Sequence, residues 1–228
     1  MTGNGNRTHT SNGSPHRWWQ IWKRGWDLDL SAYRRLALQL HHGLPRADNY
    51  SRSVLIVTPS ESPLWATGCV TLAFCMAEEL RRPVLLVDAA VDSEVSRILG
   101  CPASQGLAEF LGDPKRPLQE LALPTSQQNV CFLSRGTGQG SSLPASPENA
   151  HDLLVSSATQ WDFVVVAGGP VLKNSLALAM APFVGRVLLL VMENRTHIED
   201  IDAAQNALEL CSARNVSLVL TEQGGAAR

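Results

Sequence analysis

The chain has 228 residues, of which 44% are hydrophobic, so it can bury one substantial core, as one domain with a tail. A formal net charge of −2 and the lack of a basic stripe interleaved with aromatic residues argue against nucleic acid as a partner. Five cysteines without a CxxC pair, and no histidine cluster at ligand spacing, predict buried free thiols and no metal site. No apolar run reaches about 18 residues and no signal-peptide core is present, so we expect a cytoplasmic protein.

Three parts are predicted before residue 51. Residues 1–15 carry almost no apolar side chain and are expected to be a disordered tail. Residues 16–50 hold a basic, Trp-rich segment followed by an N-terminal helix. Trp18, Trp22 and Trp26 recur at helical spacing in that segment beside basic side chains. Three roles stay open for it: packing on its own domain, docking to a partner protein, and peripheral contact with a membrane surface.

Residues 51–223 alternate short β-branched runs with longer helical patterns, which predicts parallel βαβ construction, and 224–228 are a second tail. The expected strands are 54–57, 84–88, 130–133, 163–167, 187–191 and 216–220. The expected helices are 65–80, 93–99, 147–160, 172–182 and 196–213. Ser93 is the predicted N-cap of the second helix, and Thr196 with Glu199 is a predicted capping box. Strands that are apolar on both faces require helices on each side, so the fold class is a doubly wound α/β sheet.

The segment from strand 53–58 to the helix at Trp65 has the frame of a phosphate-binding loop without its working residues. No glycine precedes Gly68 in this loop. The three lysines are Lys23, Lys115 and Lys173, and none lies near residue 60 in the sequence. A loop lysine stabilises the charge of the transferred phosphoryl group, so its loss predicts a dead nucleotide site.

Several landmarks in chain order resemble the bacterial tyrosine autokinases, the capsule and exopolysaccharide branch of the MinD/ParA-like deviant P-loop ATPases. Residues 32–40 resemble that family's N-terminal helix motif, in which a Tyr-Arg pair opens a segment used in subunit contacts. Residues 82–89 resemble the strand of its second acidic motif, and 161–172 resemble its Walker B strand. The resemblance implies a P-loop NTPase fold of the MinD/ParA type.

The departures from that family all remove groups on which nucleotide chemistry depends. The family's lysine position falls on Ala66 or Thr67, and its loop glycines give way to bulkier residues such as Ser60 and Trp65. Asp88 persists in the second acidic motif, but its partner is Ala90. The remaining loss is at Walker B, where Ala167 replaces the aspartate that organises magnesium. We therefore expect no cofactor and no catalytic residue.

The resemblance implies a protein of exopolysaccharide or capsule production that acts by binding at the inner face of the plasma membrane. Its partner would be a membrane polysaccharide co-polymerase or an active kinase paralogue. The partner would bind to Tyr33, Arg34 and Arg35 and to the Trp-rich segment. The protein could also form a homo-oligomer. One alternative is a divergent ATPase or tyrosine kinase that still binds ATP and Mg²⁺ by recruiting a cation from a neighbouring subunit. Another is a MinD/ParA-like positioning protein or a cellulose-synthesis accessory protein.

Structural roles are expected for the other polar candidates. Asp88 is expected to accept a hydrogen bond from Thr67 or to cap a helix. Arg52 and Arg135 are expected not to bind an anion, although both remain candidates for it. His41 and His42 are adjacent in the sequence and point to different sides of a helix, so we expect no metal there.

Overall fold

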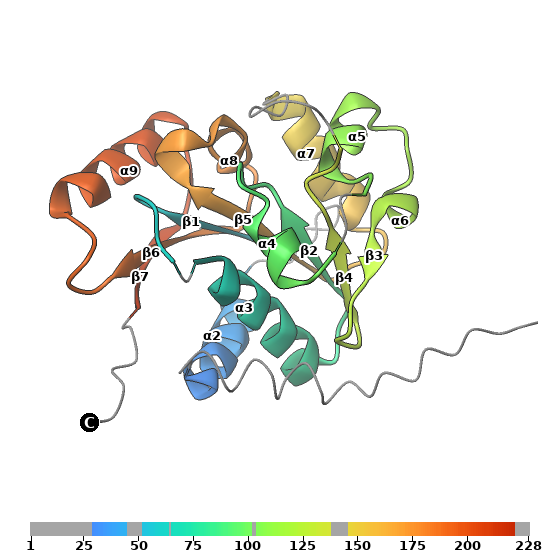
Figure 1. Ribbon diagram of the computed structural model, residues 1–228, viewed down its shortest axis with the longest axis horizontal. Helices are drawn as coiled ribbons and strands as arrows, with labels where there is room; N and C mark the ends of the chain where they lie inside the picture. Colours follow the sequence, from blue (N-terminus) through green and yellow to red (C-terminus); the bar gives the residue numbers. More distant parts are fainter. Residues whose placement is uncertain (1–28, 45–51, 64, 102–103, 138–145, 222–228) are drawn as a thin grey trace, which may run out of the picture.

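A seven-stranded sheet runs through the part of the chain that this computed structural model describes, residues 29–44, 52–63, 65–101, 104–137 and 146–221. From one edge to the other the strands are β3 (Leu123–Pro124), β4 (Val130–Leu133), β2 (Val84–Asp88), β5 (Phe163–Pro170), β1 (Arg52–Thr58), β6 (Arg186–Met192) and β7 (Val216–Thr221) (Figure 1). All neighbouring pairs are parallel except β3 and β4. The six predicted strands are confirmed, whereas β3 was missed because two residues ending in proline carry no alternation signal.

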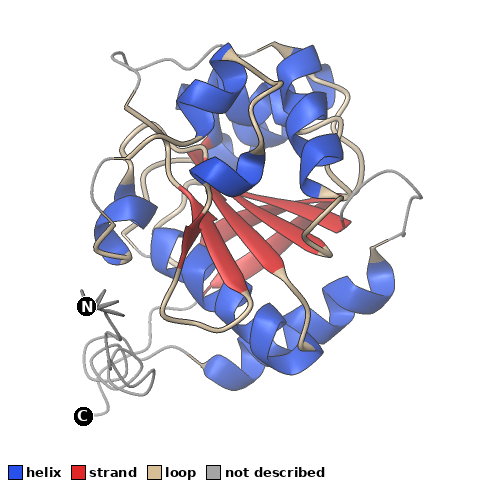
Figure 2. Ribbon diagram, turned by 90° about the vertical axis from the view of Figure 1, so that its right-hand side faces the viewer, coloured by secondary structure: helices blue, strands red, loops and turns tan. Residues whose placement is uncertain are grey.

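Helices cover both faces of the sheet, which confirms the doubly wound arrangement (Figure 2). One face carries α2 (Leu30–Gly43), α3 (Trp65–Leu80) and α4 (Glu94–Ile98). The other carries α5 (Leu107–Gly112), α6 (Leu118–Leu121), α7 (Pro147–Ser157), the 3-10 turn η1 (Val171–Lys173), α8 (Ser175–Met180) and α9 (Ile198–Leu210). The two apolar clusters lie on opposite sides of the same strands, so every residue of β5 is buried.

The N-terminal helix expected within 32–40 is longer than the motif and packs against α3. It starts after Asp29, whose Oδ1 accepts hydrogen bonds from the backbone N–H groups of Ser31 (2.9 Å) and Ala32 (3.3 Å). Ala37 and Leu40 are buried in the same cluster as α3. This helix therefore contributes to the core. The predicted tails 1–15 and 224–228 and the Trp-rich segment lie outside the described residues.

Two predictions about helices are wrong for identifiable reasons, and the predicted N-cap at Ser93 is confirmed in position. Thr196 does not cap α9, because its hydroxyl accepts the N–H of Met192 (2.9 Å) and the helix begins two residues later, at Ile198. Ser93 holds the N-cap position of α4 but forms no capping hydrogen bond, since it adopts a left-handed conformation with φ 52°. The helix predicted over 172–182 is interrupted at Asn174, whose extended backbone separates η1 from α8.

All five cysteines are free thiols. Cys69 and Cys75 are buried, as predicted, whereas Cys101, Cys131 and Cys211 are only half-buried. Within the described ranges, none of the helices has the length and apolar character needed to cross a bilayer.

Candidate functional site

The carboxyl ends of three central strands meet where the strand order reverses. β1 lies between β5 and β6 in the sheet. From β1 the chain passes first to β2 on one side, and it returns through β5 to β6 on the other side. In open α/β sheets ligands bind at such a switch point, beyond the carboxyl ends of the strands. The segments that follow Thr58, Asp88 and Pro170 therefore frame the candidate site.

The indole of Trp65 fills the junction between these segments. Trp65 is the first residue of α3 and is only 2% exposed. A Cβ atom placed on Gly169 would lie 3.3 Å from Cζ2 of Trp65 and 3.4 Å from Cβ of Ala90, so the ring packs into the turn that ends β5. Gly169 has a φ of +66°, which permits this turn without a side chain in the path of the ring. An aromatic ring thus lies between the start of α3, the end of β5 and the segment after β2.

Asp88 lies in the middle of the site with its carboxylate held by backbone and side-chain donors. Oδ1 accepts the N–H of Ala90 (3.3 Å), and Oδ2 accepts the N–H (3.2 Å) and the hydroxyl (2.9 Å) of Ser96. Of the two roles predicted for Asp88, the hydrogen bond from Thr67 is wrong and the helix cap is confirmed, because Ser96 lies in the first turn of α4. Burial raises the pKa of Asp88 to about 6, against the lowering effect of these hydrogen bonds. The carboxylate serves as an anchor between β2 and α4.

Ala167 lies beside Asp88 in the parallel register of β2 and β5, and both are fully buried. A methyl group therefore stands where the sequence resemblance places the magnesium-organising carboxylate. Among the described residues, no group of three or more His, Cys, Asp or Glu side chains is arranged to hold a metal ion.

Arg135 comes from the segment after β4 and is buried at this end of the sheet. Its Nη1 donates to the carbonyl of Ala90 (2.5 Å). Burial lowers the pKa of Arg135, while the nearby carboxylates of Asp88 and Asp92 raise it. The guanidinium thus holds the β2–α4 segment through the carbonyl of Ala90 and lies near the acidic side chains of that segment.

Asn174 was not singled out by the sequence analysis, yet it joins the ends of two strands. Its side-chain amide donates to the carbonyls of Ala89 (2.8 Å) and Gly168 (2.7 Å), and its Oδ1 accepts the N–H groups of Leu176 and Ala177 (both 3.1 Å). It is 4% exposed. The sequence signal was an asparagine inside the helix predicted over 172–182. Asparagine is unfavourable in the interior of a helix and favoured at an N-cap, so it indicated that a helix starts there.

No lysine lies near residue 60 in the sequence, but Lys173 lies near it in space. It is distant along the chain, but η1 brings its Nζ within 3.0 Å of Oε1 of Glu61 in the loop after β1. Both side chains are about two-thirds exposed, at 67% and 66%, so this ion pair contributes little to stability. A cation is therefore present beside the loop, although an acidic side chain already pairs with it.

The other predicted residues fall into two groups. Ser60 is half-buried in the loop after β1, and Ala66 and Thr67 are buried in the first turn of α3. The proposed docking residues Tyr33, Arg34 and Arg35 lie on α2. Burial raises the pKa of Tyr33 to about 12, and its hydroxyl lies 3.0 Å from where Gly68 would carry a Cβ atom.

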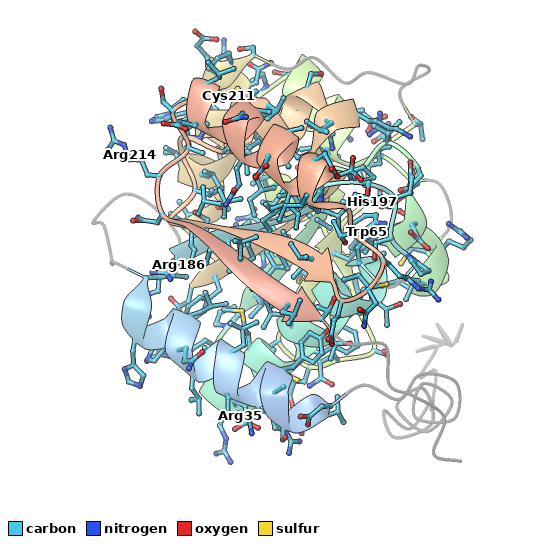
Figure 3. All side chains as sticks on the ribbon, turned by 90° about the vertical axis from the view of Figure 1, so that its left-hand side faces the viewer. Arg35, Trp65, Arg186, His197, Cys211 and Arg214 are labelled. Atoms are coloured by element: carbon cyan, nitrogen blue, oxygen red, sulfur yellow. The ribbon has the colours of Figure 1, made fainter. Side chains whose placement is uncertain are left out.

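Arg34 and Arg35 differ in how free they are to meet a partner. Arg34 pairs with Glu78 (3.3 Å) and Glu79 (3.0 Å) of α3, whereas Arg35 projects outward with 69% of its side chain exposed and contacts Asp29 (4.0 Å) and Ser31 (3.5 Å) at the start of α2 (Figure 3). Arg52 lies at the opposite end of the sheet, where its Nη1 is 3.0 Å from Nδ1 of His41 and its guanidinium lies over the Phe163 ring. The fold thus gathers Trp65, Ala90, Asp88 and Ala167, and places the arginines of α2 on a separate surface. Trp18, Trp22 and Trp26 lie outside the described residues.

No protein-family model matches the sequence, and no curated protein matches it. Solved structures do match the fold. The kinase domain of the Escherichia coli tyrosine kinase ETK superposes with a TM-score of 0.74 at 19% identity, covering 99% of this chain and 87% of that one. The chimerical protein CapA2B2 gives 0.71 at 17% identity, covering 85% and 84%. The chain has the fold of a bacterial tyrosine kinase domain.

The fold of this chain also matches that of ParA-type ATPases, as the sequence resemblance implied. A ParA family ATPase from Chlorobium tepidum matches with a TM-score of 0.63 at 17% identity, covering 76% of this chain and 74% of that one. At these identities the similarity establishes the architecture alone. The kinase-domain fold thus confirms the expected frame, and the chemistry of the site depends on the residues described above.

Proposed function

We propose that this protein is a catalytically inactive relative of the bacterial tyrosine autokinases that acts by binding, as a regulatory or scaffolding partner in exopolysaccharide or capsule production. The single observation that carries this proposal is the buried indole of Trp65 at the switch point of the sheet. Phosphate-binding loops need close approach of the backbone to the ligand, and a packed aromatic ring prevents it.

The charges around the site support the same proposal. Asp88 is engaged by three donors and Arg135 donates to a backbone carbonyl, so both groups already serve the fold. Ala167 offers no oxygen to a magnesium ion or to its water shell. Phosphoryl transfer is catalysed by positioning and charge stabilisation, and the site offers little of either.

We expect no heat of binding when Mg²⁺ and ATP are titrated into the purified full chain, and no magnesium-dependent hydrolysis of ATP.

The second candidate function, a divergent ATPase or kinase, is favoured only by the position of Lys173 beside the loop. In that case Mg²⁺–ATP raises the thermal midpoint, because a ligand of the native state stabilises it, and Lys173→Ala abolishes the shift. Lys115→Ala, an exposed lysine on another segment, is the control. Tight ATP uptake that disappears in Lys173→Ala would replace the first proposal with the second.

For docking, we propose the exposed side of α2 as the contact with a membrane polysaccharide co-polymerase or a kinase paralogue. Arg35 is the better probe, since a change at Arg34 would also break its ion pairs with α3. We expect Arg35→Glu to reduce co-purification of exopolysaccharide membrane proteins from native membranes at least severalfold. Arg97→Glu is the matched control, because Arg97 is 71% exposed on α4. Equal recovery with both variants would remove α2 from the proposal.

A further inference from the structure

The two edges of the sheet differ in how they are protected. At one edge, β3 is two residues long, ends in Pro124 and is antiparallel to its neighbour. At the other edge, β7 has six residues that pair with β6 without a shift in register. The sequence of β7 contains no proline, glycine or charged residue. Edge strands of soluble proteins are normally short, bulged or charged, so β7 has the features of a strand that accepts another strand.

The backbone groups on the open side of β7 belong to alternate residues. The carbonyls of Asn215 and Thr221 accept backbone N–H groups from the β6 side, at 3.2 and 3.0 Å, so the odd-numbered residues direct their backbone groups toward β6. Val216, Leu218 and Leu220 therefore direct their N–H and C=O groups toward the open edge. Within the described part of the chain, no strand pairs with that edge.

The same three residues expose their side chains on one face of the strand. Val216, Leu218 and Leu220 are 37%, 54% and 63% exposed, although they pair in register with core residues of β6. Figure 3 shows the open edge of β7 toward the viewer, between α9 and α2, and no described element lies in front of it. Exposed apolar side chains beside unpaired backbone groups favour the addition of a further strand.

Antiparallel pairing of β7 with β7 of a second copy uses both features in one register. With the symmetry axis at Leu218, this residue lies opposite Leu218 of the second copy, and Val216 of each copy lies opposite Leu220 of the other. These residues carry the open backbone groups, so each pair can exchange two hydrogen bonds, and together the pairs supply about six. Directly opposite residues share a face of the sheet, so the exposed apolar side chains of both copies come together.

The charges at the two ends of β7 are complementary in this arrangement. The end near Thr221 carries more acidic than basic side chains, namely Glu193, Glu199 and Asp200 against Arg195. The opposite end carries Arg186 and Arg214 against Glu209. In Figure 3, Arg186 and Arg214 lie at one end of the strand and His197, at the start of α9, lies at the other. None of these charged side chains forms an ion pair with a described residue. Antiparallel pairing brings the acidic end of each copy next to the basic end of the other.

We propose that β7 is a dimerisation strand, through which two copies of this chain join their sheets edge to edge in an antiparallel pair centred on Leu218. This inference does not depend on the proposed function. One strand of about 20 Å from each copy makes a contact smaller than the interfaces of permanent dimers. The dimer should therefore form at high protein concentration and dissociate on dilution.

The first test is sedimentation equilibrium of the purified full chain over a wide range of concentrations. The unaltered chain is expected to show a reversible equilibrium between monomer and dimer. Leu218→Asp places like charges opposite each other on the symmetry axis and should raise the dissociation constant about tenfold or more. Leu38→Asp, at a 42% exposed leucine on α2, is the matched control and should leave the dissociation constant unchanged. A monomer at every concentration, or an equal effect of both variants, overturns the proposal.

Disulfide crosslinking tests the register without weakening the contact. Leu218→Cys should crosslink with itself under mild oxidation, because directly opposite Cα atoms lie about 5.5 Å apart. Val216→Cys and Leu220→Cys should crosslink when the two variants are mixed, and neither should do so alone. The unaltered chain, with its native thiols, and Leu38→Cys are the controls and should stay uncrosslinked. Crosslinking through Leu38→Cys in place of Leu218→Cys would move the contact to α2 and overturn the proposal, as would equal crosslinking in every variant.

Discussion

Trp65→Ala is expected to lower the free energy of unfolding by about 3–5 kcal/mol, because it leaves a cavity where a buried indole packed. The ring is 2% exposed and lies against the turn at Gly169 and against Ala90. The variant should also fail to bind Mg²⁺–ATP, since opening the space restores neither a lysine in the loop nor a carboxylate at Ala167. Chemical denaturation measures the first effect and calorimetric titration the second.

Trp161→Ala is the matched control for this variant. Trp161 is 5% exposed and belongs to the cluster on the other face of the sheet, so it should lose comparable stability without opening the candidate site. If Trp65→Ala bound Mg²⁺–ATP and Trp161→Ala did not, the indole of Trp65 would be blocking a site that can otherwise bind nucleotide. The proposed loss of charge would then be wrong.

Asn174→Ala is expected to lower the free energy of unfolding by about 3 kcal/mol. The substitution leaves the carbonyls of Ala89 and Gly168 without their buried donor and removes the cap from the N–H groups of Leu176 and Ala177. A lost cap alone typically costs about 1 kcal/mol, and unpaired buried carbonyls supply the remainder.

Asn174→Asp tests whether the contacts with the two carbonyls matter when the helix cap is kept. A carboxylate keeps the acceptor for α8 but directs a second oxygen toward two carbonyls, so at neutral pH this variant should be at least as unstable as the alanine variant. Asn206→Ala, on the exposed side of α9, should change stability by less than about 0.5 kcal/mol. If Asn174→Ala were as mild as Asn206→Ala, Asn174 would not be what joins the ends of β2 and β5.

The alternation of β-branched runs with helical patterns was enough to predict the doubly wound sheet, because strands buried on both faces need apolar residues at every position. The strand 163–167 illustrates this, since each of its residues is buried in β5. Helix ends were less predictable. Thr196 fits a capping box in the sequence, yet its hydroxyl accepts a backbone N–H from Met192, a competing local hydrogen bond that spacing alone does not reveal.

The site divides in the same way. By itself the sequence determined the residue types along these consecutive segments, which include no lysine in the loop after β1 and no carboxylate at Ala90 or Ala167. Only the tertiary structure decided what takes their place. Ser96, Arg135, Asn174 and Lys173 come from four other segments of the chain, and the sheet brings them to the strand ends. Contacts between segments distant in sequence arise from the packing of whole layers, so local residue patterns carry no record of them.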